Sequence, residues 1–216
     1  MNVSEAVERR QSIRAFTDEP VGDELLADLL TKSSHAPSGG NVQPWRIYVV
    51  NGESMNRFRE FIVERQPGAP AYDIYPPGLH EPYRSIRFKN GEQLYAAIGI
   101  EREDKPGRLA QFAKNLDFFG APAALFCFID RAMGPPQWSD LGMFLQTFML
   151  LAQEAGVDTC AQEAWAVHEP AVMEFAGVPE ELRLFCGMAI GHADRDDPIN
   201  DWRSEREPLG NWATFV

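Results

Sequence analysis

The sequence has little positive charge. It contains 20 Lys and Arg residues against 32 Asp and Glu residues in a chain of 216, so its formal net charge is −12 at pH 7. DNA, RNA and anionic membranes present closely spaced negative charges, and the proteins that bind them use basic surfaces. The charge balance therefore argues against a protein dedicated to nucleic acids or to anionic membranes.

Cysteine is scarce as well. Cys127, Cys160 and Cys186 are an odd number and include no C-x-x-C pair, so neither a disulfide framework nor a zinc site is expected. Each cysteine lies in an apolar run, where a free thiol behaves as a small hydrophobic side chain. The four histidines lack metal-ligand spacing such as H-E-x-x-H, and no metal site is predicted.

Long hydrophobic runs are absent. The longest apolar segment, 143–152, is interrupted by Gln146 and is far shorter than the ~20 residues that a bilayer-spanning helix needs. The N-terminal sequence MNVSEAVERRQS has no apolar stretch of signal-peptide length. We therefore expect a cytoplasmic protein that does not enter the membrane.

Several common catalytic and nucleotide-binding motifs are also missing. No G-x-G-x-x-G follows a strand, and neither a G-x-x-x-x-G-K-[ST] loop nor a G-x-S-x-G elbow occurs, which weakens the case for dinucleotide folds, P-loop folds and serine hydrolases. The sequence does contain 14 Phe, 5 Trp and 5 Tyr residues, enough to exclude intrinsic disorder. Its length suits one large domain spanning residues 1–216.

Helical and strand patterns alternate along the chain, which predicts a layered fold of helices on a sheet. The sequence LFCFI in 123–129 is typical of a strand buried on both faces, and the run 138–155 is apolar on nearly every side, as in a central helix. The expected helices are 3–7, 23–30, 55–62, 90–102, 107–118, 138–155 and 169–176. The expected strands are 45–50, 123–129, 158–163 and 184–190.

Two segments lack clear periodicity. Residues 66–88 contain five prolines and three tyrosines, and a loop of this length inside a compact domain is usually functional or disordered. The tyrosines favour an ordered loop. The last 25 residues are polar with Trp202 and Trp212 interspersed, which indicates an extended arm that lies on another surface.

The sequence RRQSIR at 9–14 is the clearest cluster of positive charge. Arg10 and Arg14 share a face if the first helix continues, and Ser12 adds a hydroxyl between them. Arginine presents a planar fork of donors that suits phosphate. The alternative is a solvated basic helix end, whose charges complement the helix dipole.

The sequence APSGGNVQPW at 36–45 is a second candidate. Its glycines allow a close backbone approach, while Ser38, Asn41 and Gln43 can donate and accept hydrogen bonds. The edge of a flat heterocycle such as flavin would be a suitable counterpart. The alternative is a plain turn between a helix and a strand.

A third candidate pairs GVDTCAQEAWA at 156–166 with REPL at 206–209. A short strand that ends in Gln162-Glu163-Ala164 could present backbone N–H groups to a ligand. Arg206 could join Arg10 and Arg14 around a phosphate, or it could be one of several mixed charges in a solvated tail.

Together, these motifs resemble the FMN-dependent nitroreductase family over essentially the whole chain. The order R-x-S-x-R, P-S-x-x-N-x-Q-P-W, G-x-D-T and R-x-P-L is more specific than any single motif. The resemblance implies an α+β three-layer α/β/α fold with a mixed central sheet. It also implies an intertwined homodimer with two FMN sites at the subunit interface, and a C-terminal arm, 193–216, on the partner subunit.

The resemblance also implies roles for individual residues in binding FMN. Arg10, Ser12, Arg14 and Arg206 match the positions that hold the phosphate and ribityl chain. Pro37, Ser38, Gly39 and Asn41 match a loop that reaches the flavin from the other subunit, with Gln43 a weaker match. Gln162, Glu163 and Ala164 match the segment whose backbone N–H groups point at flavin N5 and O4, although some relatives have Gly where this chain has Ala164.

The family activity is hydride transfer from NADH or NADPH through flavin N5 to a nitroaromatic compound by a ping-pong scheme, with no catalytic side chain required. Aromatic side chains and two arginines are candidates for the substrate wall, because flat substrates stack on aromatic rings. These residues are Tyr83, Arg84, Arg87, Tyr95, Phe118 and Phe119. The two arginines could recognise a ring carboxylate, since the middle region resembles nitrobenzoate reductases, or they could belong to a surface loop.

The sequence leaves other functions open. The same family includes enzymes that carry out reductive dehalogenation, enone reduction and flavin fragmentation. A flavin-binding redox protein without turnover is an alternative from a different class.

Overall fold

A four-stranded sheet forms the centre of the molecule in a computed structural model that describes residues 1–216. Its strands are β1 (Arg46–Asn51), β2 (Ala123–Asp130), β3 (Asp158–Gln162) and β4 (Leu182–Gly191). They lie in the order β1-β2-β4-β3, and each neighbouring pair is antiparallel. Strand β2 is buried along all but its last residue, which confirms the expectation drawn from its unbroken apolar run.

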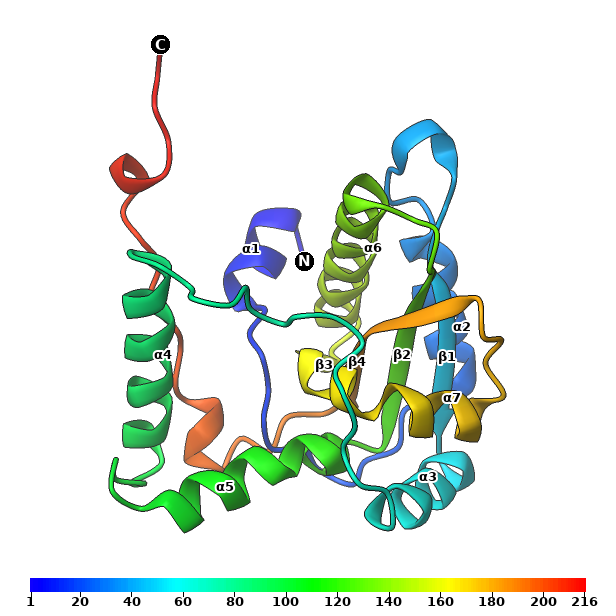
Figure 1. The fold of residues 1–216 in the computed structure, drawn as a ribbon, viewed down its shortest axis with the longest axis horizontal. Coiled ribbons are helices and arrows are strands. Elements are labelled where there is room, and N and C mark those ends of the chain that lie inside the picture. The colour runs from blue at the N-terminus through cyan, green and yellow to red at the C-terminus, as the bar shows by residue number, and fades with distance from the viewer.

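Helices cover both faces of this sheet (Figure 1). On one face, α6 (Pro135–Glu154) and α2 (Asp23–Ser33) pack against the odd-numbered side chains of β2, such as Leu125. On the other face, α3 (Glu53–Val63) and α7 (Glu169–Ala176) pack against the even-numbered ones, such as Phe126. Because neighbouring side chains of a strand point to opposite faces, β2 serves both halves of the core, and the expected three-layer α/β/α arrangement is confirmed.

The expected mixed sheet is corrected by the strand pairing. After β2, the chain passes through α6 and enters β3, which runs parallel to β2. The two strands are not neighbours, because β4 lies between them and is antiparallel to both. Parallel strands are therefore present without being neighbours. The one parallel pairing is an isolated bridge between Ser12 and Thr159.

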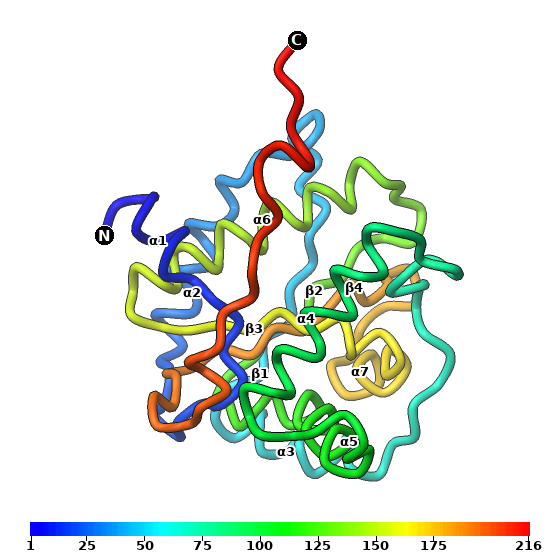
Figure 2. The backbone as a smooth tube through the Cα atoms, turned by 90° about the vertical axis from the view of Figure 1, so that its left-hand side faces the viewer, coloured from blue at the N-terminus to red at the C-terminus, as the bar shows by residue number.

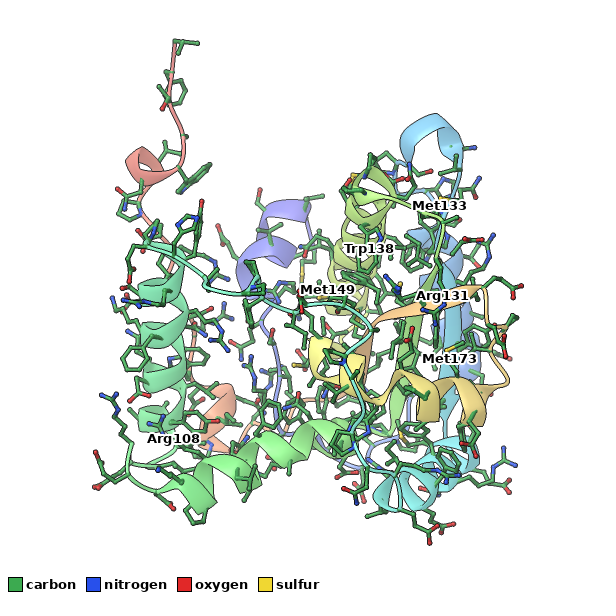
Figure 3. The ribbon with its side chains drawn as sticks, viewed as in Figure 1. Arg108, Arg131, Met133, Trp138, Met149 and Met173 are labelled. Atoms are coloured by element: carbon green, nitrogen blue, oxygen red, sulfur yellow. The ribbon has the colours of Figure 1, made fainter.

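A bulge between Cys127 and Phe128 interrupts the pairing of β2 with β4. Near this bulge, the carboxylate of Glu169 accepts hydrogen bonds from Leu184 N at 2.9 Å and from Arg131 Nη2 at 3.1 Å. Figure 3 shows Arg131 beside Met173 of α7. The ion pair ties the end of β2 to the start of α7, and so supports the segment 163–168 that leads from β3 into this helix.

Gly187 of β4 is needed for the close approach of that segment. A Cβ at this position would collide with the indole of Trp165, which is fully buried against Phe58, Phe118 and Phe126. The short 3₁₀ segment Glu163–His168 is thereby fixed on the sheet directly after β3. This is the point where the candidate site lies.

The predicted loop 66–88 ends earlier than expected, because its last residues belong to α4, which begins at Tyr83 and runs to Ala97. Helix α4 buries no side chain, so it has no apolar stripe by which its start could be recognised. The remaining loop is ordered. Gly68 N donates to Val167 O at 2.8 Å, Ala71 N donates to Ala166 O at 2.9 Å, and the Tyr72 hydroxyl hydrogen-bonds Phe185 O.

Helices α1 (Val3–Arg9), α4 and α5 (Lys105–Ala113) complete the fold. Arg108 of α5, labelled in Figure 3, bonds both carboxylate oxygens of Glu92 in α4, at 2.6 and 3.1 Å. The C-terminal arm then passes α4 and leaves the body of the fold (Figure 2). No helix is both long and apolar enough to cross a bilayer.

Candidate active site

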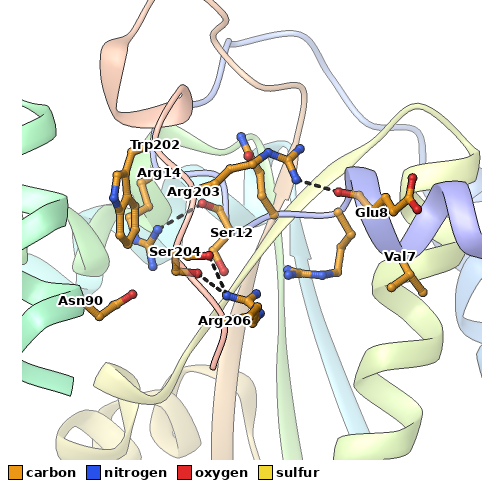
Figure 4. A pocket seen from close by; sticks show the side chains of 11 residues that line it. Val7, Glu8, Ser12, Arg14, Asn90, Trp202, Arg203, Ser204 and Arg206 are labelled. Atoms are coloured by element: carbon orange, nitrogen blue, oxygen red, sulfur yellow. Dashed lines mark hydrogen bonds between the residues drawn. The ribbon is translucent and has the colours of Figure 1, made fainter. Parts of the chain in front are cut away.

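A cavity of about 380 Å³ lies between the end of α1, the segment that follows it and the C-terminal arm. Four arginines line this cavity, together with Ser12, Gln11 and Trp202 (Figure 4). The arginines are Arg10, Arg14, Arg203 and Arg206. In a chain with net charge −12, this concentration of positive charge marks an anion site, which we call the arginine cavity.

None of these four arginines forms an ion pair with a carboxylate. Arg203 donates to the carbonyls of Glu8 and Arg9, at 2.6 and 2.9 Å. Arg14 donates to Ser12 O at 3.2 Å and Arg206 to Ser204 Oγ at 2.7 Å. These neutral acceptors orient the guanidinium groups without cancelling their charge.

The electrostatics of the arginine cavity fit a dianion. Burial lowers the pKa of Arg10, and the neighbouring charges of Arg206 and Arg203 lower it further. Like charges held this close repel one another. A phosphate group would relieve that repulsion and accept several of the charged donors at once, so the residues present fit the phosphate of FMN.

Asn200 joins the two chain segments that form this cavity. Its Oδ1 accepts from Arg14 N at 2.9 Å and its Nδ2 donates to Ala15 O at 2.8 Å. Ile13 N donates to Thr159 O of β3 at 3.1 Å, which fixes the same segment against the sheet. Neither Asn200 nor Arg203 is predicted from the sequence, and the mixed charges of RSERE give no signal for Arg203.

A second cavity of about 440 Å³ adjoins the first, with Arg14 in the wall of both. We call it the ring cavity, because aromatic and apolar side chains form most of its wall beside the end of β3. It is lined by Ile74, Tyr75, Leu94, Tyr95, Phe112, Phe119, Cys160 and Ala161, together with the polar residues Arg14, Arg87, Gln111, Asn115, Gln162 and Glu163, and with Ala164. A flat aromatic molecule suits such a wall.

Gln162 offers a free acceptor in the wall of the ring cavity. Its Nε2 donates to Asn115 O at 2.9 Å and to Asn115 Oδ1 at 3.1 Å, while its buried Oε1 has no partner. A buried acceptor without a partner is costly. A heterocycle with an N–H group on its edge would satisfy it, so this cavity fits the polar ring of FMN.

Glu163 is the one carboxyl group in the wall of the ring cavity. Its side chain is accessible, but partial desolvation raises the pKa of this carboxyl above its ordinary value. Burial also raises the pKa of the Cys160 thiol, despite the opposing effect of Arg14. Cys160 is therefore held as a neutral thiol, in keeping with the apolar role expected for it.

The structure brings most of the predicted site residues together. Arg10, Ser12, Arg14 and Arg206 line the arginine cavity. Gln162, Glu163, Ala164, Arg87, Tyr95 and Phe119 line the ring cavity. Tyr83 lies outside both, in a third cavity next to them.

Two predicted substrate residues lie elsewhere. Phe118 is fully buried in the core, with its ring centroid 4.7 Å from that of Trp165, so it cannot form a substrate wall. Consecutive positive φ angles at Phe118 and Phe119, 49° and 56°, turn the first ring into the core. Arg84 lines none of these cavities and is exposed, with Nε 3.0 Å from Glu81 Oε1.

The loop from Pro37 to Gln43 lies away from these cavities of its own chain, at the far side of α6 from α4 (Figure 1). Gly39 N donates to Asp140 Oδ2 at 3.3 Å, and Gln43 N donates to Ser38 Oγ at 3.0 Å. Asn41 and Gln43 have positive φ angles of 57° and 47°. Such a conformation is strained for residues other than glycine, and strained loops are often found at functional sites.

A family model described as "Nitroreductase family" matches residues 7–192. The chain belongs to the nitroreductase family. The nitrobenzene nitroreductase of Ectopseudomonas oleovorans is 34% identical over 99% of this chain and 96% of its own length. The 4-nitrobenzoate reductase of Pseudomonas putida is 33% identical over 97% of this chain and 93% of its own length. The family resemblance drawn from the motifs is confirmed.

Solved structures of this family share the fold. The FMN- and NADPH-dependent nitroreductase NfnB of Sphigopyxis sp. strain HMH superimposes with a TM-score of 0.95 and is 46% identical, covering 100% of this chain and 99% of its own. NfnB of Mycobacterium smegmatis, solved in complex with NADPH, superimposes with a TM-score of 0.92 at 27% identity and covers 100% of both chains.

Proposed function

We propose that this member of the nitroreductase family is an FMN-dependent NAD(P)H oxidoreductase that reduces nitroaromatic compounds. The observation on which this depends is the arginine cavity, whose four unpaired guanidinium groups adjoin an aromatic cavity at the end of β3. Relatives that match nearly the whole chain are a nitrobenzene nitroreductase and FMN- and NADPH-dependent nitroreductases. Bound FMN supplies hydride acceptance and donation at its N5 atom.

The chain's own residues would bind and orient that cofactor. Arg10, Arg14, Arg203 and Arg206 would hold the phosphate, with the Ser12 hydroxyl beside them. Gln162 Oε1 and the backbone at Glu163 and Ala164 would face the polar edge of the ring system. The positive field of the arginines extends to the ring cavity through Arg14, where it would stabilise negative charge on the reduced ring.

We further propose that two copies of this chain, each one domain of residues 1–216, form the sites together. The loop from Pro37 to Gln43 lies outside the cavities of its own chain and would complete the site of its partner. The arm ends in exposed apolar side chains, Leu209, Trp212, Phe215 and Val216, which would lie on the partner subunit. Three buried free cysteines suit a reducing, cytoplasmic compartment.

The same ring cavity would receive donor and acceptor in turn, as a ping-pong scheme requires. The wall around it is largely apolar and aromatic, with Tyr95, Phe112 and Phe119 prominent. A flavin-binding redox protein without turnover would have the same arginine cavity. Turnover with an aromatic acceptor separates the two functions.

The experiment is a visible spectrum of the FMN-loaded protein before and after NADH or NADPH, followed by steady-state oxidation of the donor with nitrobenzene. Bleaching of the flavin absorbance and multiple turnovers are expected. Arg206→Ala should lose bound FMN, while Arg57→Ala, an exposed arginine outside the cavities, should retain it. FMN-loaded protein that oxidises neither donor would overturn the enzymatic function.

A further inference from the structure

Asp140, in the second turn of α6, carries a carboxylate that is buried without a cation. The residue is 4% exposed, and no lysine, arginine or histidine pairs with it. Its Oδ2 accepts a hydrogen bond from Gly39 N at 3.3 Å. A buried carboxylate without a cation is costly for the folded chain, so stability alone does not explain its presence.

Helix α6 holds the loop from Pro37 to Gln43 at both ends. Asp140 bonds the loop near its start, at Gly39. Phe144 lies four residues further along α6 and therefore on the same side of the helix. Its ring stacks on Trp45, which follows the loop, with the centroids 4.9 Å apart and the ring planes inclined by 23°. Residues 40–43, between these two contacts, are exposed.

The bond from Asp140 fixes the orientation of one peptide group of the loop. The peptide that joins Ser38 and Gly39 donates its N–H to Asp140, and its carbonyl accepts from Asn41 N at 2.9 Å. Because a peptide group is planar, two bonds on opposite edges hold its plane. The turn that follows has positive φ angles at Asn41 and Gln43, and such strained residues keep their conformation only where surrounding contacts hold them.

We propose that Asp140 is a positioning residue for the FMN site of the partner subunit. In one copy of the chain, it holds the loop from Pro37 to Gln43 in the shape with which this loop completes the site of the other copy. This inference rests on the proposed function, which gives the loop that place. It adds a residue that acts through Gly39, without touching the cofactor, on a site whose arginines belong to the other chain.

A role of Asp140 in the stability of α6 alone leads to a different expectation. An acid favours the positive end of a helix dipole only within the first turn, and Asp140 is the sixth residue of α6. Leucine has nearly the same shape as aspartate and no charge. Replacing an unpaired buried charge with an apolar side chain of similar volume is often neutral or stabilising, so Asp140→Leu should fold.

The first measurement compares FMN affinity with stability in Asp140→Leu. The melting temperature of the FMN-free protein should stay the same or rise. The Kd of FMN, from flavin fluorescence titration, should increase by about 10-fold, as for loss of one hydrogen bond to a charged acceptor. Asp140→Asn keeps an acceptor oxygen and should restore most of the affinity. Ser139→Ala, whose lost hydroxyl bonds Pro136 O rather than the loop, is the control and should bind FMN as the wild type does.

The second measurement uses mixed dimers and asks in which chain Asp140 acts. One copy carries Asp140→Leu and the other carries Arg206→Ala, with different affinity tags so that the mixed dimer can be purified. Of its two sites, one combines the altered loop with the altered arginine cavity, and the other combines an unaltered loop with an unaltered arginine cavity. The mixed dimer should therefore bind one FMN with wild-type affinity, although each variant alone binds FMN weakly.

A wild-type Kd of FMN in Asp140→Leu would overturn the proposal. A mixed dimer without a tight site would overturn it as well, because Asp140 would then act on the site of its own chain or on the fold as a whole. The mixed dimer decides this even where Asp140→Leu lowers the melting temperature. An Arg206→Ala protein that binds FMN tightly would instead contradict the proposed function, whatever the effect of Asp140→Leu.

Discussion

Arg10 illustrates how this chain keeps charge available for a ligand. Its side chain is partly buried in the wall of the arginine cavity, beside Arg203 and Arg206, and makes no ion pair. Burial and repulsion both lower its pKa, so its charged form is less favourable in the folded chain than in the unfolded one. A protein keeps such a group where a bound anion later stabilises it.

Replacing Arg10 with Met should separate ligand binding from stability. Met retains much of the side-chain volume but removes the charge, so the melting temperature of the FMN-free protein should stay the same or rise. The Kd of FMN should increase by about 10- to 100-fold, the usual effect of losing a charged hydrogen bond. Flavin fluorescence titration and thermal melts with and without FMN measure both quantities. A lower melting temperature without FMN, at an unchanged Kd, would give Arg10 a structural role instead.

At the level of residues, the sequence predicts three of the four arginines of the arginine cavity, Arg10, Arg14 and Arg206. Arg10, Ser12 and Arg14 stand out because no acid interrupts them. Arg206 is found only through the R-x-P-L motif, whereas Arg203 belongs to no motif and lies in RSERE, where the local sequence suggests mutual neutralisation of the charges. In the folded chain Glu205 pairs with Lys89 at 2.6 Å and Glu207 accepts from Asn211 Nδ2 at 2.6 Å, so contacts distant from this motif leave its arginines uncompensated.

At the scale of elements, α4 has no fully buried side chain in the core and is joined to its neighbours by ion pairs. It buries no side chain, and its ionic partners are Arg108 of α5, which binds Glu92, and Glu205 of the arm, which binds Lys89. The Arg108 guanidinium lowers the pKa of Glu92 through hydrogen bonding, and Lys89 does the same for Glu205. The position of α4 should therefore depend on pH.

The direction of this dependence follows from the lowered pKa values. Both carboxyls have folded-state pKa values below the ordinary 4.5, so their contribution is complete above about pH 5 and is lost as the pH falls through the folded values. The protection factors of the α4 amides, which are corrected for the intrinsic slowing of exchange in acid, should fall by about two- to fivefold for each exposed pair lost, before those of the β2 amides respond. The double variant Glu92→Gln with Glu205→Gln should exchange fast at neutral pH and lose the pH response. An equal fall in the amide protection factors of α4 and β2 would show that α4 does not respond to pH separately from the sheet.

Buried elements could be predicted from the sequence and α4 could not, for a physical reason. Strand β2 and helix α6 are recognisable because their apolar residues meet other residues of the same chain. The start of α4 at Tyr83 has no apolar stripe, and Glu81 binds Arg84 Nε and Ser85 N there at 3.0 and 3.2 Å. Such local contacts do not produce a periodic pattern. The antiparallel pairing of all neighbouring strands could not be predicted either. It depends on the position of β4 between β2 and β3, which no local sequence pattern specifies.

At the scale of the whole molecule, the proposed dimer accounts for two features that a single chain leaves without a role. The arginine and ring cavities adjoin each other on the side of α4, whereas the loop from Pro37 to Gln43 and the end of the arm lie away from them. Trp212 and Phe215 are 70% and 87% exposed. Exposed apolar groups of this size are typical of surfaces that another protein covers.

A chain that ends at Pro208 should show whether the arm holds two copies together. This truncation keeps Arg203 and Arg206 but removes the exposed apolar end, so the dimer should dissociate at protein concentrations where the full chain remains dimeric. Affinity for FMN should fall with it if the loop from Pro37 to Gln43 completes the site of the second copy, as proposed. Sedimentation velocity measures the first effect and flavin fluorescence the second, with Val63→Ser, an exposed valine on α3, as the control expected to change neither. A full chain that binds FMN tightly while sedimenting as a monomer would show that each site is complete within one chain, and the arm would then need another role.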